Sequence, residues 1–333
     1  MASRHERHDV LPPSPRNPSP AETGEVSTLT SIFLSQKEFS EARDEIEIAF
    51  RRFDYEPRHG RIILRIPSTT QEVFVQLIKS AIHDELARVA SHDTKAGLFA
   101  SQIVSAGSSR IFLDDNEDSD SDDRDVTLKN TRRQPDDQYQ HNKAAFPGVV
   151  IEVSSSEDKK RLSKLAKQYI HFTCGNIKAV ICIDINPGIH STISVWRPRF
   201  TEERRTSTVT MDIEHVVQAE PFRSADGRSM NGERALTLTL HDFAPDVLCR
   251  NIPPISISLS FAQICEFMAR AKRIHEVRES VDKKGIMSNR RVKRHRLSSS
   301  SIEELRSKND DRFAKQEKKA LDKAENHLTS ILR

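Results

Sequence analysis

Residues 148–185 read GVVIEVSSSEDKKRLSKLAKQYIHFTCGNIKAVICIDI, in which two apolar, β-branched runs flank a helix-forming segment. The two runs are GVVIEVS at 148–154 and KAVICIDI at 178–185. Strands that are apolar on both faces are typical of parallel pairs buried between helices, and a helical crossover commonly joins such a pair. The stretch therefore predicts a strand–helix–strand unit at the centre of an α/β domain.

The segments around this unit extend it into a larger domain. Upstream, residues 61–67 form a β-rich run, and residues 68–90 place apolar side chains at helical spacing behind a capping box, either Ser68 to Gln71 or Thr69 to Glu72. Residues 101–113 indicate strand material interrupted by a turn. Downstream, the strand-like runs are 191–198, 207–213, 235–243 and 254–260, followed by a helical segment at 261–277. We expect these strands either to extend the central sheet or to build a small β subdomain.

Composition separates this core from the ends of the chain. Charged residues make up 30% of the 333 residues and hydrophobic residues 36%, which indicates that part of the chain is not packed. We predict a disordered tail at 1–26, an α/β domain at 27–280, and a basic, charged, partly helical tail at 281–333. Within the domain, DDNEDSDSDDRD at 114–125 repels itself and predicts a flexible acidic loop over 114–130.

Several classes of protein are disfavoured. The four cysteines form no CxxC pair, so neither a zinc site nor a disulfide framework is indicated. The N-terminus lacks the apolar core of a signal peptide, and no stretch approaches the roughly 18 apolar residues of a membrane span. We therefore expect an intracellular protein without membrane association.

Positive charge is local rather than global. The net charge of +3 is too small for a polycation, so any attraction to nucleic acid must come from clusters. The strongest cluster is RRVKRHR at 290–296, between Arg290 and Arg296. It predicts nuclear import, with a cytoplasmic location otherwise. The alternative is a generic basic tail.

Two acidic residues are candidates for chemistry. Glu152 lies inside the apolar run GVVIEVS, and Asp136 follows Pro135 sixteen positions earlier. An unpaired buried carboxylate is costly, whereas coordination of a divalent cation would compensate for its charge. Alternatives remain for both residues. Asp136 could cap a turn, and Glu152 could face solvent on an edge strand or pair with a buried arginine.

An ordered series of motifs carries a resemblance to a known family. The chain resembles the PD-(D/E)XK, or restriction-endonuclease-like, superfamily, and it is most similar to a group of uncharacterised fungal proteins related to it. The resemblance covers about 65–200 and, more weakly, 242–267. The motifs are Pro135-Asp136, IEV at 151–153, LAKQYI at 165–170, GNIKAVICIDI at 175–185 and SVWRP at 194–198.

The resemblance implies both a fold and an activity. The implied fold is a mixed central β-sheet flanked by helices, with extra C-terminal strands, and the implied activity is hydrolysis of DNA phosphodiesters with Mg²⁺ or Mn²⁺. Asp136 and Glu152 would bind the metal through their side chains and Val153 through its carbonyl, while Glu72 would assist. If Thr69 rather than Ser68 is the N-cap, Glu72 would occupy the N3 position of the capping box, where glutamate serves the helix itself. Because such enzymes often dimerise, a homodimer is a further expectation.

One position departs from the family pattern. The superfamily has a lysine two residues after the glutamate, where it stabilises developing negative charge, but position 154 is serine. In some members the lysine comes from the following helix, so we predict Lys159, with Lys160 second. Otherwise these lysines form the solvated face of that helix. The second hypothesis is therefore a catalytically inert nuclease-fold module that binds nucleic acid or protein, and the third is a structural nuclear scaffold.

Overall fold

The computed structural model describes residues 29–50, 52–114, 130–155, 159–185, 188–203, 208–279 and 285–286. The predicted N-terminal tail, nearly all of the acidic loop, the 290–296 cluster and nearly all of the C-terminal tail lie outside these residues. All the elements below belong to one compact unit within Met1–Lys284.

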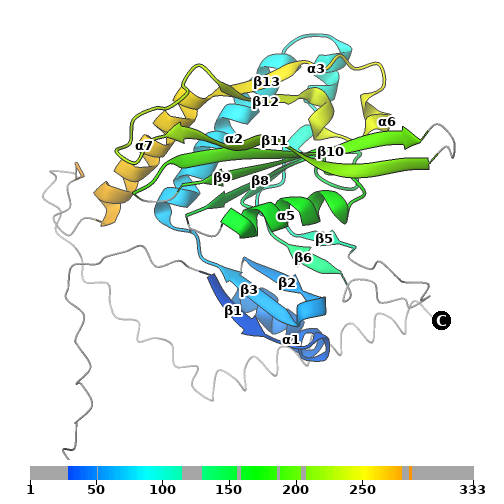
Figure 1. Cartoon of the computed structure of the whole chain (residues 1–333), viewed down its shortest axis with the longest axis vertical. Coiled ribbons are helices and arrows are strands. Elements are labelled where there is room, and N and C mark those ends of the chain that lie inside the picture. The colour runs from blue at the N-terminus through cyan, green and yellow to red at the C-terminus, as the bar shows by residue number, and fades with distance from the viewer. Residues whose placement is uncertain are drawn as a thin grey trace, which may run out of the picture. The chain divides into compact units, whose positions relative to one another are not determined.

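A six-stranded sheet forms the centre of this unit (Figure 1). In the described pairings, β8 and β9 are parallel and the other neighbours are antiparallel. Helix α5 (Lys159–His171) connects β8 to β9, which confirms the predicted strand–helix–strand unit. In sheet order the strands are β11 (Thr208–Arg223), β10 (Ser191–Glu203), β9 (Ala179–Asp184), β8 (Val149–Ser154), β7 (Asp137–His141) and β4 (Ile103–Ser105).

Helices cover both faces of this sheet. Because side chains alternate along a strand, Ile151 and Ile181 pack on one face with α2 (Thr69–Ala90) and α7 (Phe261–Glu279). Val150 and Val180 pack on the other face with α5. The helices predicted at 68–90 and 261–277 are therefore confirmed, and the architecture is mixed α/β.

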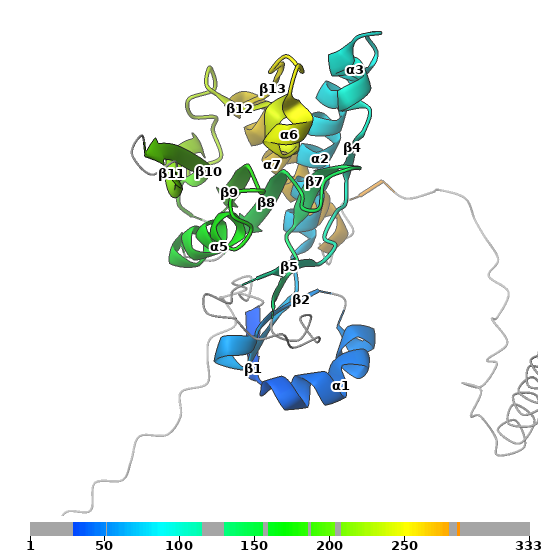
Figure 2. The same ribbon diagram turned by 90° about the vertical axis from the view of Figure 1, so that its right-hand side faces the viewer.

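A second sheet is built from segments that are distant in sequence. Its strand order is β1, β3, β2, β6, β5, and it is accompanied by α1 (Gln36–Ala49), as Figure 2 shows. The strands are β1 (Leu29–Phe33), β2 (Phe53–Glu56), β3 (Arg61–Arg65), β5 (Ile111–Leu113) and β6 (Thr131–Arg133), and a 3-10 turn (Pro57–His59) joins β2 to β3. Only the strand material at 61–67 and 101–113 was expected from the sequence.

The C-terminal strands follow both of the expected alternatives. Strands β10 and β11 extend the central sheet, whereas β12 (Ala235–Thr239) and β13 (Ser256–Ser260) form a separate two-stranded sheet. The short helices are α3 (Lys95–Ala100), α6 (Asp246–Cys249) and a 3-10 turn (Leu240–Phe243). Among the described helices, none combines the length and apolar character needed to cross a membrane.

Candidate functional site

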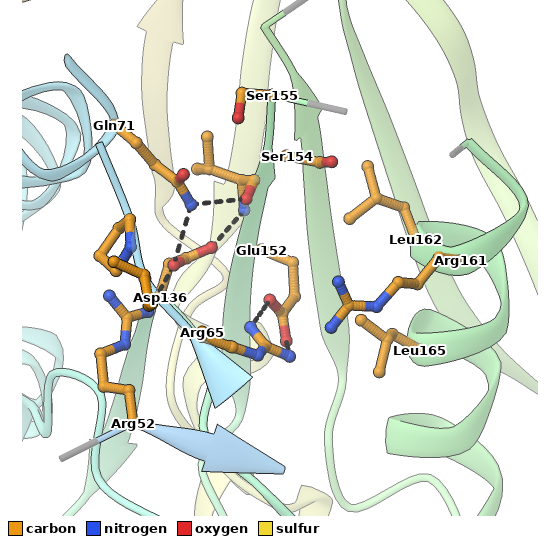
Figure 3. A pocket seen from close by; sticks show the side chains of 13 residues that line it. Arg52, Arg65, Gln71, Asp136, Glu152, Ser154, Ser155, Arg161, Leu162 and Leu165 are labelled. Atoms are coloured by element: carbon orange, nitrogen blue, oxygen red, sulfur yellow. Dashed lines mark hydrogen bonds and ion pairs between the residues drawn. The ribbon is translucent and has the colours of Figure 1, made fainter. Parts of the chain in front are cut away.

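A pocket opens where the two sheets meet, between the ends of β3 and β8 and the first turns of α2 and α5 (Figure 3). Its volume is about 50 Å³. One water molecule needs roughly 10–15 Å³ on this measure, so the pocket has room for a few waters or one small ion. Asp136, Glu152 and Val153 all line it.

Asp136 lies in the segment that passes from β6 in the small sheet to β7 in the central sheet, and it is 8% exposed. Its Oδ2 accepts a hydrogen bond from the N–H of Val153 at 2.6 Å. Its Oδ1 accepts from Arg52 Nη2 at 2.5 Å and from Gln71 Nε2 at 3.4 Å. The carboxylate therefore has partners from three other segments, which a local turn cap would not require.

Glu152 is 1% exposed and is held by two side chains, of which Figure 3 shows Arg65. Arg65 donates from Nη1 to Oε2 at 2.6 Å and from Nη2 to Oε1 at 3.2 Å. The Tyr169 hydroxyl, from α5, donates to Oε1 at 2.7 Å. Of the alternatives open at the sequence level, the structure has the one in which Glu152 pairs with a buried arginine.

Arg65 also binds a second buried acid. Its Nε and Nη2 donate to Asp54 Oδ2 at 3.0 and 2.7 Å. Asp54 is fully buried in β2, and its Oδ1 accepts from the N–H of Gln134 at 2.9 Å. Arg65 therefore bridges two buried carboxylates through a charge-assisted, multi-point contact, which is the strongest kind of side-chain hydrogen bonding in proteins.

The two acids bridged by Arg65 differ in their electrostatics. Burial raises the pKa of Glu152, and the nearby charges of Asp136 and Asp54 add to this against the opposing effect of Arg65. Burial also acts on Asp54, but Arg65 and Arg133 outweigh it, so the pKa of Asp54 lies below its usual value. Asp54 consequently keeps its negative charge to lower pH than Glu152 does.

Gln71 donates a hydrogen bond to the carbonyl of Val153, the backbone group that was expected to bind the metal. Its Nε2 donates to the Val153 carbonyl at 2.9 Å as well as to Asp136. Gln71 lies in the first turn of α2, whose N-terminus is capped by Ser68. One amide from this helix thus contacts two of the three groups expected to bind metal.

The implied Mg²⁺ or Mn²⁺ does not fit this arrangement of donors. Both oxygens of Asp136 and of Glu152 accept hydrogen bonds, and each carboxylate is paired with a guanidinium. A Mg²⁺ ion demands near-octahedral oxygen ligands at about 2.0–2.1 Å and would lie against two fixed cations here. Among the described residues, no group of three or more His, Cys, Asp or Glu side chains is arranged to hold a metal.

The cations that the structure describes in the pocket are arginines, not the predicted Lys159 and Lys160. Lys160 lines a separate hollow with Lys164 and Lys167, and the side chain of Lys159 lies outside the described part of the chain. The cation that α5 contributes to the pocket is Arg161, while Ser154 lines it from β8. Burial and the nearby charge of Arg65 lower the pKa of Arg161.

Glu72 lies one step away from the pocket. Its Oε1 accepts from Arg52 Nη1 at 2.9 Å, and Arg52 in turn binds Asp136. The Glu72 side chain is 48% exposed. Glu72 therefore positions a partner of Asp136 and does not line the pocket itself.

Sequence reasoning missed most of the polar groups in the pocket. The missed residues that line the pocket are Arg52, Arg65, Gln71 and Arg161. Two residues behind it, Asp54 and Tyr169, were missed as well. Gln71 lies in the capped helix expected at 68–90 and Tyr169 in the motif LAKQYI, so their positions could be predicted from the sequence but their partners could not. No family model matches this chain, and no curated protein matches it.

Proposed function

We propose that this chain is a restriction-endonuclease-like protein that binds DNA phosphates without metal-dependent hydrolysis. The observation that carries the proposal is the buried ion pair between Arg65 and Glu152, with Nη1 and Oε2 2.6 Å apart. Glu152 is paired with Arg65, and Arg65 is also paired with Asp54. Glu152 therefore does not provide a site for a divalent cation. Ser154 adds to this, because it stands where the superfamily has its lysine.

The restriction-endonuclease-like core is supported by the order of the elements. Asp136 precedes β7, Glu152 lies in the neighbouring β8, and α5 leads from β8 to the parallel strand β9. This is the order in which the resemblance places its two acids, its helix and its second strand. Helices on both faces of a mixed sheet agree with the implied architecture.

Phosphate binding is supported by the charges that line the pocket. Three guanidinium groups line it, from Arg52, Arg65 and Arg161. Arg52 pairs with Asp136 and Arg65 with Glu152, while the buried Asp54 behind the pocket contacts both Arg65 and, at 3.7 Å, Arg161. The Arg52 and Arg161 side chains are 14% and 23% exposed, and Figure 3 shows them on opposite sides of the two acids. Arginine suits phosphate because its planar group donates two parallel hydrogen bonds. The pocket volume suits a single phosphate group rather than a base.

A second candidate is the Mg²⁺-dependent phosphodiesterase that the resemblance implies. It is favoured by one observation, namely that Asp136, Glu152 and Val153 line the same pocket. For this activity Arg52 and Gln71 would have to leave Asp136, and Arg65 would have to release Glu152. Lys159 or Arg161 would then be the charge-stabilising cation.

One pair of assays separates the two candidates. The full chain and Glu152→Ala are tested for binding to a labelled duplex by fluorescence anisotropy, and for nicking of supercoiled plasmid, in EDTA, Mg²⁺ and Mn²⁺. The proposal expects Mg²⁺ to give no gain in DNA affinity over EDTA, because added cations only compete for the phosphates, and it expects no nicking in any condition. Mg²⁺-dependent nicking that Glu152→Ala abolishes would establish the second candidate, and absence of DNA binding would refute the proposed function. Thermal unfolding of Glu152→Ala checks that the variant is folded.

The homodimer and the nuclear location remain predictions, because the residues described here bear on neither.

A further inference from the structure

Helix α5 presents a basic face that the pocket does not use. Lys160, Lys164, Lys167 and His171 follow one another at spacings of four, three and four residues. At about 100° per residue these positions share an arc of roughly 60°, and at about 1.5 Å per residue they extend over roughly 16 Å. Three lysines and a histidine therefore form one continuous stripe, called the α5 stripe below.

The stripe has no compensating acids within its own helix. Residues 159–171 contain no Asp or Glu, and no described carboxylate forms an ion pair with Lys160, Lys164 or Lys167. Like charges four residues apart destabilise a helix. A helix face that is simply exposed to solvent usually avoids such repulsion by carrying both basic and acidic side chains.

Other surface helices of the chain do mix them. Arg43 pairs with Glu47 and Lys37 with Glu41 on α1, and Arg88 pairs with Glu85 on α2. The α5 stripe thus differs from the surfaces of α1 and α2 in a way that helix stability does not explain. The charge of its three lysines, which no described carboxylate pairs, is complementary to a polyanion.

The stripe borders an open hollow that is lined partly by apolar side chains. This hollow, of about 570 Å³, is lined by the four basic residues together with Gln168, Phe172 and Ile213. It is far larger than the arginine pocket and open to solvent. Lys167 also lies 5.5 Å from the centroid of the Trp196 ring, which holds its ammonium beside β10. A row of cations beside apolar side chains suits a chain of phosphates joined by sugars better than a small anion.

The stripe and the pocket share one helix. Arg161, beside Lys160, lines the pocket, so the two surfaces adjoin at the first turn of α5. We propose that the α5 stripe binds the sugar–phosphate backbone of the DNA that also contacts the pocket. This inference rests on the proposed function and adds to it a second, non-overlapping contact surface along α5.

The test is a salt titration of DNA binding with the full chain in EDTA. Lys160→Gln, Lys164→Gln and Lys167→Gln are combined in one triple variant. The matched control combines Lys37→Gln, Lys95→Gln and Lys143→Gln, which removes the same charge from exposed positions elsewhere. Each lost phosphate contact lowers the slope of log affinity against log salt by about 0.9 for duplex DNA. We expect the triple variant to lower this slope by about 2–3 and the control to leave it within about 0.5 of the native value.

Several outcomes would overturn the inference. If the triple variant and the control behave alike, the stripe is a solvated face. If an acidic peptide of equal charge competes with DNA for the native chain and loses binding to the triple variant, the partner is an acidic protein segment. An Arg161→Gln variant separates the pocket proposal from the stripe proposal. If Arg161→Gln binds DNA more weakly while the triple variant binds like the native chain, the stripe proposal alone is refuted. If the native chain does not bind DNA, both proposals are refuted. Circular dichroism confirms that each variant keeps its helices.

Discussion

The guanidinium of Arg65 makes a two-point contact with the carboxylate of Glu152, although 87 positions separate these residues in sequence. The contact joins the small sheet to the central sheet, because Arg65 ends β3 and Glu152 lies in β8. It also explains how a charged residue is accommodated in an otherwise apolar strand. A buried carboxylate needs a partner, and here the partner is an arginine.

Replacing Arg65 should strongly destabilise the fold. Arg65→Ala would leave Asp54 and Glu152 buried without their shared cation, and breaking a buried pair in this way typically costs about 3–5 kcal/mol. Urea denaturation measures this cost. Arg88→Ala is the control, because Arg88 pairs with Glu85 at the surface, and such pairs contribute about 0–1 kcal/mol. A loss below about 1 kcal/mol for Arg65→Ala would contradict a structural role for the bridge.

The contribution of Asp54 should be lost in acid. The pKa of Asp54 is lowered in the folded state, because Arg65 and Arg133 outweigh the effect of burial. A lowered pKa stabilises the fold above the unfolded value of about 3.9, and this stabilisation disappears as the pH falls through the folded pKa. We therefore expect Asp54→Asn to be less stable than the native chain at pH 7, and the difference to shrink steadily below pH 4. Thermal unfolding across pH 2–7 measures this, and a difference that is constant with pH would be contrary to the account.

Glu152 should behave in the opposite way. Burial raises its pKa, with Asp136 and Asp54 adding to the effect. The stabilisation linked to its protonated form is complete below the unfolded pKa of about 4.3 and is lost as the pH rises through the folded pKa. The stability deficit of Glu152→Gln relative to the native chain should therefore be smaller at pH 7 than at pH 4. Urea denaturation at the two pH values measures it, and a larger deficit at pH 7 would disagree with the raised pKa.

How much of the fold and the site could be predicted from the sequence depends on how far apart in the sequence the interacting residues lie. Strands β8 and β9 and helices α2, α5 and α7 follow from local periodicity, and they are in place. The small sheet does not, because β5 and β6 are only three residues long, and β6 joins the sheet by pairing with β2, far upstream in the sequence. The order of Asp136 and Glu152 was visible in the sequence, whereas Arg65 could be matched to Glu152 only once β3 and β8 were brought together. Arg161, the cation that α5 contributes to the pocket, was not predicted, because only lysines of α5 were candidates for the family's lysine.

Introducing a lysine at position 154, where the proposed superfamily has one, should not confer hydrolysis. In Ser154→Lys the ammonium would enter the pocket from β8, where Ser154 lies now. Arg65 would still hold Glu152, so no metal would be bound for the lysine to assist. We expect no Mg²⁺-dependent nicking of supercoiled plasmid by this variant, with Ser155→Lys as the neighbouring control. Nicking by Ser154→Lys alone would indicate that the pocket accepts a cation after all.

Neutralising the pocket cation of α5 should weaken DNA binding without abolishing it. Hydrogen bonds to charged groups contribute about 1.5–3 kcal/mol, so Arg161→Gln should lower affinity by roughly tenfold or more. It should also lower the salt slope by about 0.9, as one phosphate contact would. Anisotropy in EDTA measures both quantities, and Arg88→Gln is a control of equal charge. Unchanged affinity in Arg161→Gln would remove the pocket from the DNA contact.

The central claim is that Arg65, and not a metal ion, is the partner of Glu152. Binding of Mn²⁺, followed by electron paramagnetic resonance of the free ion, tests it most directly, because the acidic run at 114–125 is the same in every variant and cancels from the comparison. We predict that the native chain, Asp136→Asn and Glu152→Gln bind equal amounts of Mn²⁺. One additional equivalent bound by the native chain, and lost in both variants, would contradict the account.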